Sequence, residues 1–135
     1  MIEIYRAYEN GLPIVGPTYL AKSLQISKSS AQQALKNLAE KGYGEYIERK
    51  GFLINEKGLE EAKKIVKKHR LLESFLADIF SLDAITACNE ASKIDAFASE
   101  NLINLIEKKF GYEYCPCGHK IPKWDGYFYS WLWYF

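Results

Sequence analysis

The sequence predicts a mostly α-helical protein with one short β-ribbon, and three observations lead to this fold class. Apolar residues recur at helical spacing along most of the chain, and the period changes to short strand-like runs near residues 44–55. Ser27, Asp83 and Ser99 each stand just before an apolar stretch, where a helix N-cap residue is favoured. With 135 residues, 48% of them hydrophobic and 26% charged, the chain suits one compact unit or two small ones.

Three short helices are expected before the strand-like runs. The first covers residues 2–10, and the second covers about 17–25, with Pro17 in the first turn where proline is tolerated. Ser27 is expected to cap the third helix, because its hydroxyl can accept a hydrogen bond from a free backbone N–H of the next turn. Gly42 closes that helix, since glycine is favoured just beyond a helix C-terminus.

A hairpin and three further helices are predicted to follow. The runs 44–48 and 52–55 flank a compact turn, so they predict a hairpin whose tip carries Arg49 and Lys50. The helices are expected over residues 56–80, about 83–97 and about 99–109. The last two helices carry apolar positions that need a partner surface: Ile85, Ala91, Ile94, Phe97, Leu102, Leu105 and Ile106.

The net charge of +1 conceals two halves of opposite sign. Residues 1–70 hold 13 Lys and Arg against 8 Asp and Glu, whereas residues 71–135 hold 5 against 9. The basic half favours a phosphate-bearing partner, although a solvated helix face gives the same excess. With neither a membrane span nor a signal peptide in the sequence, we expect a cytoplasmic protein with no membrane partner. The odd number of cysteines, three, argues against a disulfide framework.

The order of helix, helix, capped helix and two-stranded ribbon is that of a winged helix-turn-helix, which predicts double-stranded DNA as the partner. A helix fits the major groove, and its early residues reach the base edges. The candidate reading residues on the third helix are Ser27, Lys28, Ser29, Ser30, Gln32, Gln33 and Lys36. Arg49 and Lys50 at the hairpin tip are expected to meet flanking phosphates or the minor groove.

Four runs of residues carry a resemblance to a known family. They are His69-Arg-Leu-Leu-Glu-Ser-Phe-Leu, Asn89-Glu-Ala-Ser-Lys-Ile-Asp, Leu102-Ile-Asn-Leu-Ile and Cys115-Pro-Cys-Gly-His-Lys-Ile-Pro. In this order after a winged helix, the chain resembles the diphtheria-toxin-repressor and manganese-transport-regulator family of metal-dependent transcriptional repressors. The resemblance implies a homodimeric repressor for which a divalent transition metal (zinc, iron or manganese) is the corepressor.

The same resemblance implies the domain organisation. A winged-helix domain is expected over residues 1–58, followed by a linker helix and a helical dimerisation and metal-binding domain over residues 59–122. The family's SH3-like third domain has no counterpart, and an aromatic tail stands in its place at residues 123–135. We expect this tail to dock on its own helical domain or on a dimer mate, because a free aromatic patch of this size is rare in a monomer.

Ligand positions carry over from the family one residue at a time. His69 stands at the family's histidine ligand on the long helix, and Glu73 stands at a glutamate that some members use in an ancillary site. Cys88 stands where those members have a further histidine of that site. The trio is chemically coherent, since His, Glu and Cys are all zinc-type ligands, and cysteine favours zinc over manganese.

The family's primary metal site is depleted in this sequence. Asp95 keeps a carboxylate ligand on a shorter arm, whereas Ser92 and Ala96 stand at the positions of a Cys or Glu ligand and a His ligand. A ligand on the first helix has no counterpart, because that position lies before Met1. The weaker candidates for completing a metal site are Cys115, Cys117 and His119.

Two other interpretations remain open. One is a regulator of the same fold that ignores metal and responds to redox state or to a ligand, in which Cys88 is an ordinary buried apolar residue. The other is a protein-interaction module, because winged helices also serve in protein–protein roles. An enzyme is not expected, since the sequence shows no nucleophile–base motif and no glycine-rich phosphate loop.

Overall fold

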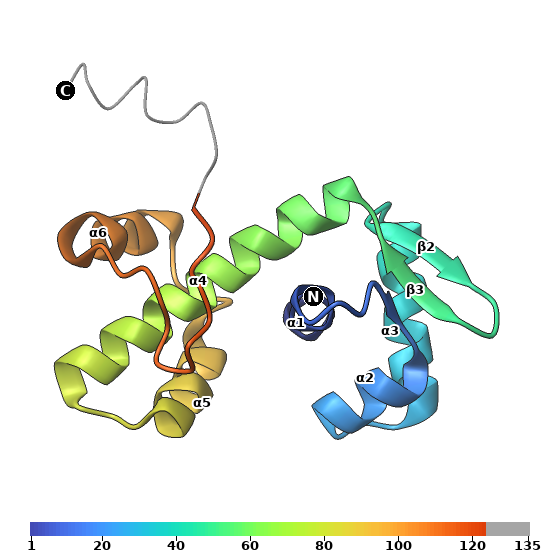
Figure 1. Ribbon diagram of the computed structural model, residues 1–135, viewed down its shortest axis with the longest axis horizontal. Coiled ribbons are helices and arrows are strands. Elements are labelled where there is room, and N and C mark those ends of the chain that lie inside the picture. Colours follow the sequence, from blue (N-terminus) through green and yellow to red (C-terminus); the bar gives the residue numbers. More distant parts are fainter. Residues whose placement is uncertain (124–135) are drawn as a thin grey trace, which may run out of the picture. The chain divides into compact units, whose positions relative to one another are not determined.

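The computed structural model describes residues 1–123 (Figure 1), so the aromatic tail predicted at residues 123–135 lies, except for Lys123, outside the described residues, and so does its predicted docking. The chain divides into two compact units, one of residues 1–66 and one that begins at Lys67. Among the described residues, no helix is both long enough and apolar enough to cross a membrane. The mostly helical fold predicted from the sequence is confirmed.

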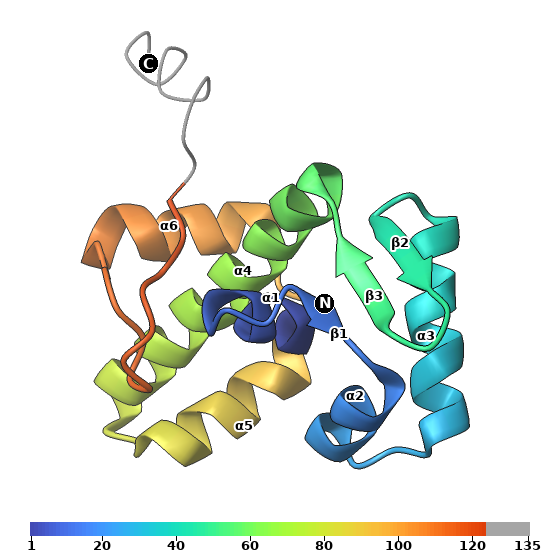
Figure 2. The same ribbon diagram turned by 45° about the vertical axis from the view of Figure 1, so that its right-hand side comes forward.

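The first unit holds three short helices and a small antiparallel sheet. Its elements are α1 (Ile2–Glu9), β1 (Ile14–Val15), α2 (Pro17–Leu24), α3 (Lys28–Glu40), β2 (Gly44–Ile47), β3 (Gly51–Ile54) and the start of α4 (Glu56–Phe80). The sheet order is β1-β3-β2 (Figure 2), so the predicted two-stranded ribbon is in fact three-stranded. The sequence pattern missed β1 because two residues are too few to show an alternation.

The close approach of β1 to β3 requires glycine at position 51. Gly51 has a φ of 126°, and a Cβ at this position would lie 2.4 Å from the carbonyl oxygen of Val15. A side chain there would therefore separate the two strands and strain the backbone. Arg49, in the turn just before, also has a positive φ of 67°, which holds the hairpin tip in a tight bend.

Short polar side chains start three of the helices, as the sequence predicts. Ser27, Asp83 and Ser99 each accept a hydrogen bond from the backbone N–H three residues later, at 3.1, 2.8 and 3.1 Å. The bond from the Thr86 N–H also lowers the pKa of Asp83, because it stabilises the charged carboxylate. These caps satisfy backbone donors that a helix start otherwise leaves open.

One face of α3 is in the core of the first unit and the other meets solvent. Ala31 and Leu35 are fully buried, together with Phe52 of β3. Ala62 and Val66 of α4 belong to this same core, which is why the first unit runs to Val66. The apolar period of α3 therefore fixes which of its side chains point outward.

The second unit is built from the rest of α4, α5 (Ala84–Ile94) and α6 (Glu100–Phe110). Its core contains Leu71, Leu72, Ala91, Ile103, Ile106 and Ile121. The helix predicted to run to residue 97 ends at Ile94, so Phe97 lies beyond it.

Several apolar side chains of α5, α6 and the segment between them remain on the surface of the described structure. Ile85 is 76% exposed and Phe97 is 90% exposed, and Ile94, Leu102 and Leu105 are also exposed. Ala91 and Ile106 are buried instead. The sequence predicts that these apolar side chains pack against a partner surface, and no segment within residues 1–123 covers them. Such exposure is expected of a domain that dimerises.

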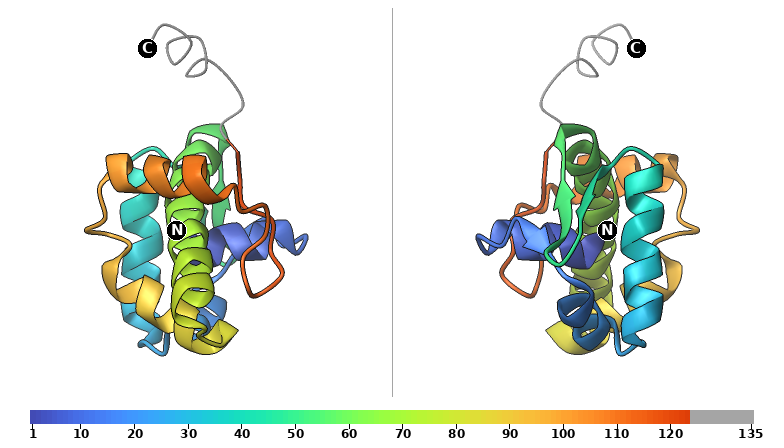
Figure 3. Two further views of the ribbon diagram at one scale, coloured as in Figure 1. Left: turned by 90° about the vertical axis from the view of Figure 1, so that its left-hand side faces the viewer. Right: turned by 90° about the vertical axis from the view of Figure 1, so that its right-hand side faces the viewer.

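The segment after α6 lies along α4 (Figure 3) and is held there by polar contacts. The buried Arg70 donates from its guanidinium to the carbonyl oxygen of Lys120 at 2.7 Å. Tyr114 and Lys120 form an isolated β-bridge, so the residues between them make a narrow turn. This turn brings Cys115 and Cys117 to α4.

Candidate metal centre and nucleic-acid interface

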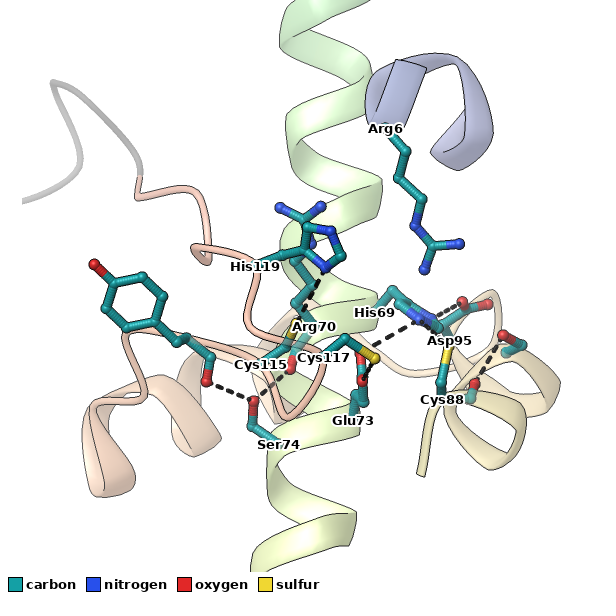
Figure 4. Close-up of polar contacts among 12 residues, drawn as sticks. Arg6, His69, Arg70, Glu73, Ser74, Cys88, Asp95, Cys115, Cys117 and His119 are labelled. Atoms are coloured by element: carbon teal, nitrogen blue, oxygen red, sulfur yellow. Dashed lines mark hydrogen bonds and ion pairs between the residues drawn. The ribbon is translucent and has the colours of Figure 1, made fainter. Parts of the chain in front are cut away.

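Three of the predicted metal ligands meet in the second unit (Figure 4). His69 and Glu73 lie one turn apart on α4, and both side chains are buried, with 1% of each residue exposed. The His69 Nε2 atom lies 3.4 Å from the Sγ of Cys88 on α5 and 3.7 Å from Oε2 of Glu73. The three donor atoms all lie within 4.8 Å of one another, a compact group that can hold a metal ion.

Asp95 lies on the opposite side of the His69 ring. Its Oδ2 atom is 3.0 Å from Nδ1, whereas Nε2 is the nitrogen that faces Cys88 and Glu73. A carboxylate in this position favours a proton on Nδ1 and leaves the lone pair of Nε2 for a metal. Asp95 thus stands outside the donor group and orients one of its members.

A second donor group shares Glu73 with the first. Its members are Glu73, Cys115 and Cys117, again with one donor atom of each within 4.8 Å of the others. The Cys117 thiol donates to Oε1 of Glu73 at 2.8 Å. Loss of solvent around the Sγ, followed by this hydrogen bond and the Glu73 charge, raises the pKa of the Cys117 thiol to about 12. Without a metal, this contact therefore holds a protonated thiol.

His119 and the residues at the depleted primary positions are not members of either donor group. The Nδ1 atom of His119 is 4.0 Å from the Cys115 Sγ, and His119 belongs to neither donor group. Ser92 is exposed and donates its hydroxyl to the Cys88 carbonyl oxygen at 2.9 Å. Ala96 is exposed too and has no ligating atom. Among residues 1–123, the donors therefore gather on the His69 side and not at the depleted primary positions.

The donor chemistry fits a transition-metal ion. One imidazole, one carboxylate and three thiols are the ligands of zinc-type sites, and thiolates disfavour manganese. A buried carboxylate such as Glu73 is costly without a countercharge, and a cation would supply that charge. The sequence analysis missed the role of Glu73 in two groups, because Glu73 and Cys117 are 44 residues apart and nothing local signals their contact.

The predicted DNA-reading residues lie in the first unit, at the start of α3 and at the hairpin tip. Ser27, Lys28, Ser29, Ser30 and Gln33 are exposed, and so are Arg49 and Lys50. Gln32 and Lys36 are half-buried, and the Lys36 ammonium lies 5.4 Å from the ring centre of Tyr46 on β2. The early α3 residues thus face solvent, whereas Lys36 is also tied to the sheet.

Within this interface, several polar side chains are already hydrogen-bonded to one another or to neighbouring residues. The Ser27 Oγ accepts the cap hydrogen bond of α3 from the Ser30 N–H and donates its own hydroxyl proton to the Ser30 Oγ at 2.8 Å. Gln33 donates from Nε2 to the Asn37 Oδ1 at 2.9 Å, which orients its amide along the helix. Asn37 is a neighbour that the sequence analysis did not include among the reading residues.

The fold, with its helix-turn-helix unit and its cluster of His, Glu and Cys donors, is that of a DNA-binding transcriptional regulator. Comparison with known families shows to which family of regulators the chain belongs. The model "Iron dependent repressor, N-terminal DNA binding domain" matches residues 2–52, and "Iron dependent repressor, metal binding and dimerisation domain" matches residues 55–123. The chain belongs to this iron-dependent repressor family, which confirms the resemblance seen in the sequence.

Known relatives agree with this assignment. An uncharacterised HTH-type transcriptional regulator of Methanocaldococcus jannaschii is 38% identical over 99 residues, which cover 73% of this chain and 78% of the relative. A solved structure of a hypothetical protein from Sulfolobus solfataricus is 30% identical and has a TM-score of 0.67, with 90% and 92% of the two chains covered. A solved manganese-dependent transcriptional repressor in complex with manganese is 29% identical, with a TM-score of 0.76 and 84% of this chain covered.

This chain spans about half, 52%, of that manganese-dependent repressor. Its two matched domains are the DNA-binding one and the one for metal binding and dimerisation. The protein is therefore a helix-turn-helix transcriptional regulator of the metal-dependent repressor family, with DNA and a second copy of itself as partners. The family is one of regulators and not of enzymes, in agreement with the expectation from the sequence.

Proposed function

We propose that this protein represses transcription as a homodimer when a divalent metal ion binds at His69, Glu73 and Cys88. The observation that carries the proposal is the group of three donor atoms within 4.8 Å of one another, from two helices of the second unit. The ion would be held by His69 Nε2, Glu73 Oε2 and Cys88 Sγ, and Asp95 would orient the imidazole through Nδ1. When bound, the ion supplies positive charge that joins α5 to α4.

The donor set favours zinc over manganese or iron. Cys88 is a thiolate donor, and soft sulfur ligands select zinc-like ions, whereas manganese prefers oxygen. The solved relative described above binds manganese, but it does so in its own donor set. Selectivity in this chain is therefore proposed to follow from Cys88.

Helix α4 is proposed to carry the metal signal. It contributes Ala62 and Val66 to the core of the first unit, and it contributes His69 and Glu73 to the donor group of the second. An ion that is bound more tightly in one conformation of the chain shifts the population toward that conformation. The proposal is that the metal-bound conformation is the one that binds DNA.

The reading residues are proposed to be those at the start of α3 and at the hairpin tip. Gln32 and Gln33 carry amides that can pair with adenine through two hydrogen bonds, and the serines and Lys28 can meet base edges or phosphates. Arg49 and Lys50, exposed at the hairpin tip, are proposed to contact the sugar–phosphate backbone, and such contacts position a protein without reading sequence.

Fluorescence anisotropy tests the proposal, with duplex fragments from upstream of the protein's own coding region. Binding should be lost with chelator and restored by Zn²⁺, and the His69→Ala variant should bind neither the ion nor DNA. Glu90→Gln, an exposed change on α5, is the matched control and should behave as wild type. Equal metal content in wild type and His69→Ala would overturn the metal site. Binding indifferent to chelator would instead support the metal-independent regulator.

A further inference from the structure

The carboxylate of Glu73 has one oxygen in each of the two donor groups. Its Oε2 lies 3.7 Å from His69 Nε2, and its Oε1 lies 2.8 Å from the Cys117 Sγ (Figure 4). We propose that Glu73 bridges two thiophilic metal ions, one held with His69 and Cys88 and the other with Cys115 and Cys117. This inference rests on the proposed function for its first ion and adds a second ion to it.

The spacing of the donors favours two ions over one. Around a tetrahedral ion with bonds of about 2.0–2.3 Å, donor atoms lie roughly 3.3–3.8 Å apart. The distances from His69 Nε2 to Cys88 Sγ and to Glu73 Oε2, 3.4 and 3.7 Å, fit one such ion. The donors of Cys115 and Cys117 fall outside that group and share only Glu73 with it. A single ion would have to leave these two thiols unused or break up the His69 group.

The second group already holds its atoms close together. The Cys117 thiol proton occupies the line between Sγ and Oε1, and a metal ion would replace that proton with a modest widening of the 2.8 Å contact. The turn that carries both cysteines is fixed to α4 independently of them, by the bond from Arg70 to the Lys120 carbonyl oxygen. Because Arg70 is itself buried, the turn is positioned before any ion arrives.

The formal charges of the donors also match two divalent ions. As thiolates, Cys88, Cys115 and Cys117 together with the Glu73 carboxylate carry four negative charges, and two divalent ions carry four positive ones. His69 is neutral when it binds a metal. With one ion in a largely buried site, either the excess negative charge stays uncompensated or a thiol must stay protonated. Two divalent ions therefore neutralise the whole donor set, whereas one ion does not.

The second ion would join a different segment to α4. The first ion links α5 to α4 through Cys88, whereas the second links the turn after α6 to α4 through Cys115 and Cys117. Both ions would share Glu73 as a ligand, so this side chain would take part in both connections to α4. Occupancy of both sites would thus fix α5 and the turn on α4 at once.

Native mass spectrometry of the full chain, titrated from the metal-free state with Zn²⁺, tests the inference directly. Wild type should bind two ions per chain. Cys117→Ser and Cys88→Ser should each retain one ion, and Glu73→Gln should weaken both sites, because Glu73 belongs to both donor groups. A parallel titration with Cd²⁺ should give a thiolate-to-metal ultraviolet absorbance in Cys117→Ser that is well below that of wild type.

Controls separate a lost ligand from a lost fold. Cys117 is exposed, so its replacement is expected to leave the helices intact, and circular dichroism of each variant must match wild type. Glu113→Gln, at an exposed position in the segment that carries Cys115 and Cys117, is the control for Glu73→Gln and should keep two ions. The wild-type stoichiometry needs no variant and decides by itself whether a second ion binds.

The outcomes distinguish this inference from the proposed function. One ion per wild-type chain, lost in Cys88→Ser, would overturn the bridged pair and leave the proposed centre standing. Two ions retained in Cys117→Ser would overturn the inference as well. If Cys88→Ser lost no ion, the proposed centre itself would be wrong, and the bridge would fail with it.

Discussion

The functional residues of the two units differ in where they lie and in how they are brought together. In the first unit the predicted reading residues are mostly exposed and come from the start of one helix and one hairpin tip. In the second unit the donor atoms are largely buried and come from α4, α5 and the turn after α6. The first arrangement depends on local structure, whereas the second depends on the packing of distant segments.

This difference indicates which substitutions should affect each of the two sites. An exposed side chain on a stable helix can be replaced with little effect on folding, so its effect on function is direct. A donor in a buried cluster is held by its neighbours, so a change at a residue that never touches the metal is still felt. The following predictions test this contrast, from the largest expected effect to the smallest.

The largest effect is expected where α3 packs on its core. Leu35→Ala removes a fully buried side chain and should lower the free energy of unfolding by about 2–5 kcal/mol. Urea denaturation followed by circular dichroism measures this. Leu12→Ala, at a half-exposed loop position, is the control and should cost less than about 1 kcal/mol. Equal losses in both variants would mean that α3 is not seated on the core as described.

Substitutions among the predicted DNA-reading residues should distinguish effects on sequence specificity from effects on overall DNA affinity. Gln33→Ala should cost about 1–3 kcal/mol on a preferred duplex and less on other sequences, because an amide that pairs with a base is lost. Lys50→Ala should weaken binding to all duplexes similarly and lower the slope of log affinity against log salt by about 1. Anisotropy at several salt concentrations measures both changes. Identical behaviour of the two variants would remove the distinction between base reading and backbone contact.

Asp95 tests whether the buried centre depends on a residue outside its donor group. Asp95→Asn keeps the shape of the side chain but weakens its hold on the His69 Nδ1, so metal affinity should fall about 10–100-fold. Competition with a chromophoric chelator measures the affinity. Glu90→Gln, exposed on α5, should leave the metal affinity unchanged. Loss of stoichiometry, not merely of affinity, would make Asp95 a ligand.

The smallest effect is expected at the cap of α5. The Thr86 N–H lowers the folded-state pKa of Asp83, so the cap adds stability at pH values above the ordinary aspartate pKa. That contribution should fade as the pH falls through the folded pKa, and it should be small because Asp83 is exposed. Thermal melts between about pH 5 and pH 2 should show a slightly shallower acid dependence for Asp83→Asn than for wild type. Identical acid dependence in both would argue against the cap.

Much of the fold was predictable because its signals are local. The caps at Ser27, Asp83 and Ser99 act within three residues, and the apolar period of α3 marks Ala31 and Leu35 as its buried side. The family resemblance came from motif order, which needs no coordinates. The third strand β1 and the true end of α5 were missed, because two residues carry no period and a helix end depends on what packs beyond it.

The sequence alone therefore determined the helices, the hairpin and the family, and it indicated the candidate donor residues. Tertiary structure decided how those donors are arranged: Cys88 lies 19 residues from His69, Asp95 lies 26 residues from it, and Cys117 lies 44 residues from Glu73. Hydrogen bonds within a turn follow from neighbouring residues, whereas the distance between segments so far apart depends on side-chain packing throughout the unit. For that reason the double use of Glu73 and the position of Asp95 behind the imidazole are visible only in the folded chain.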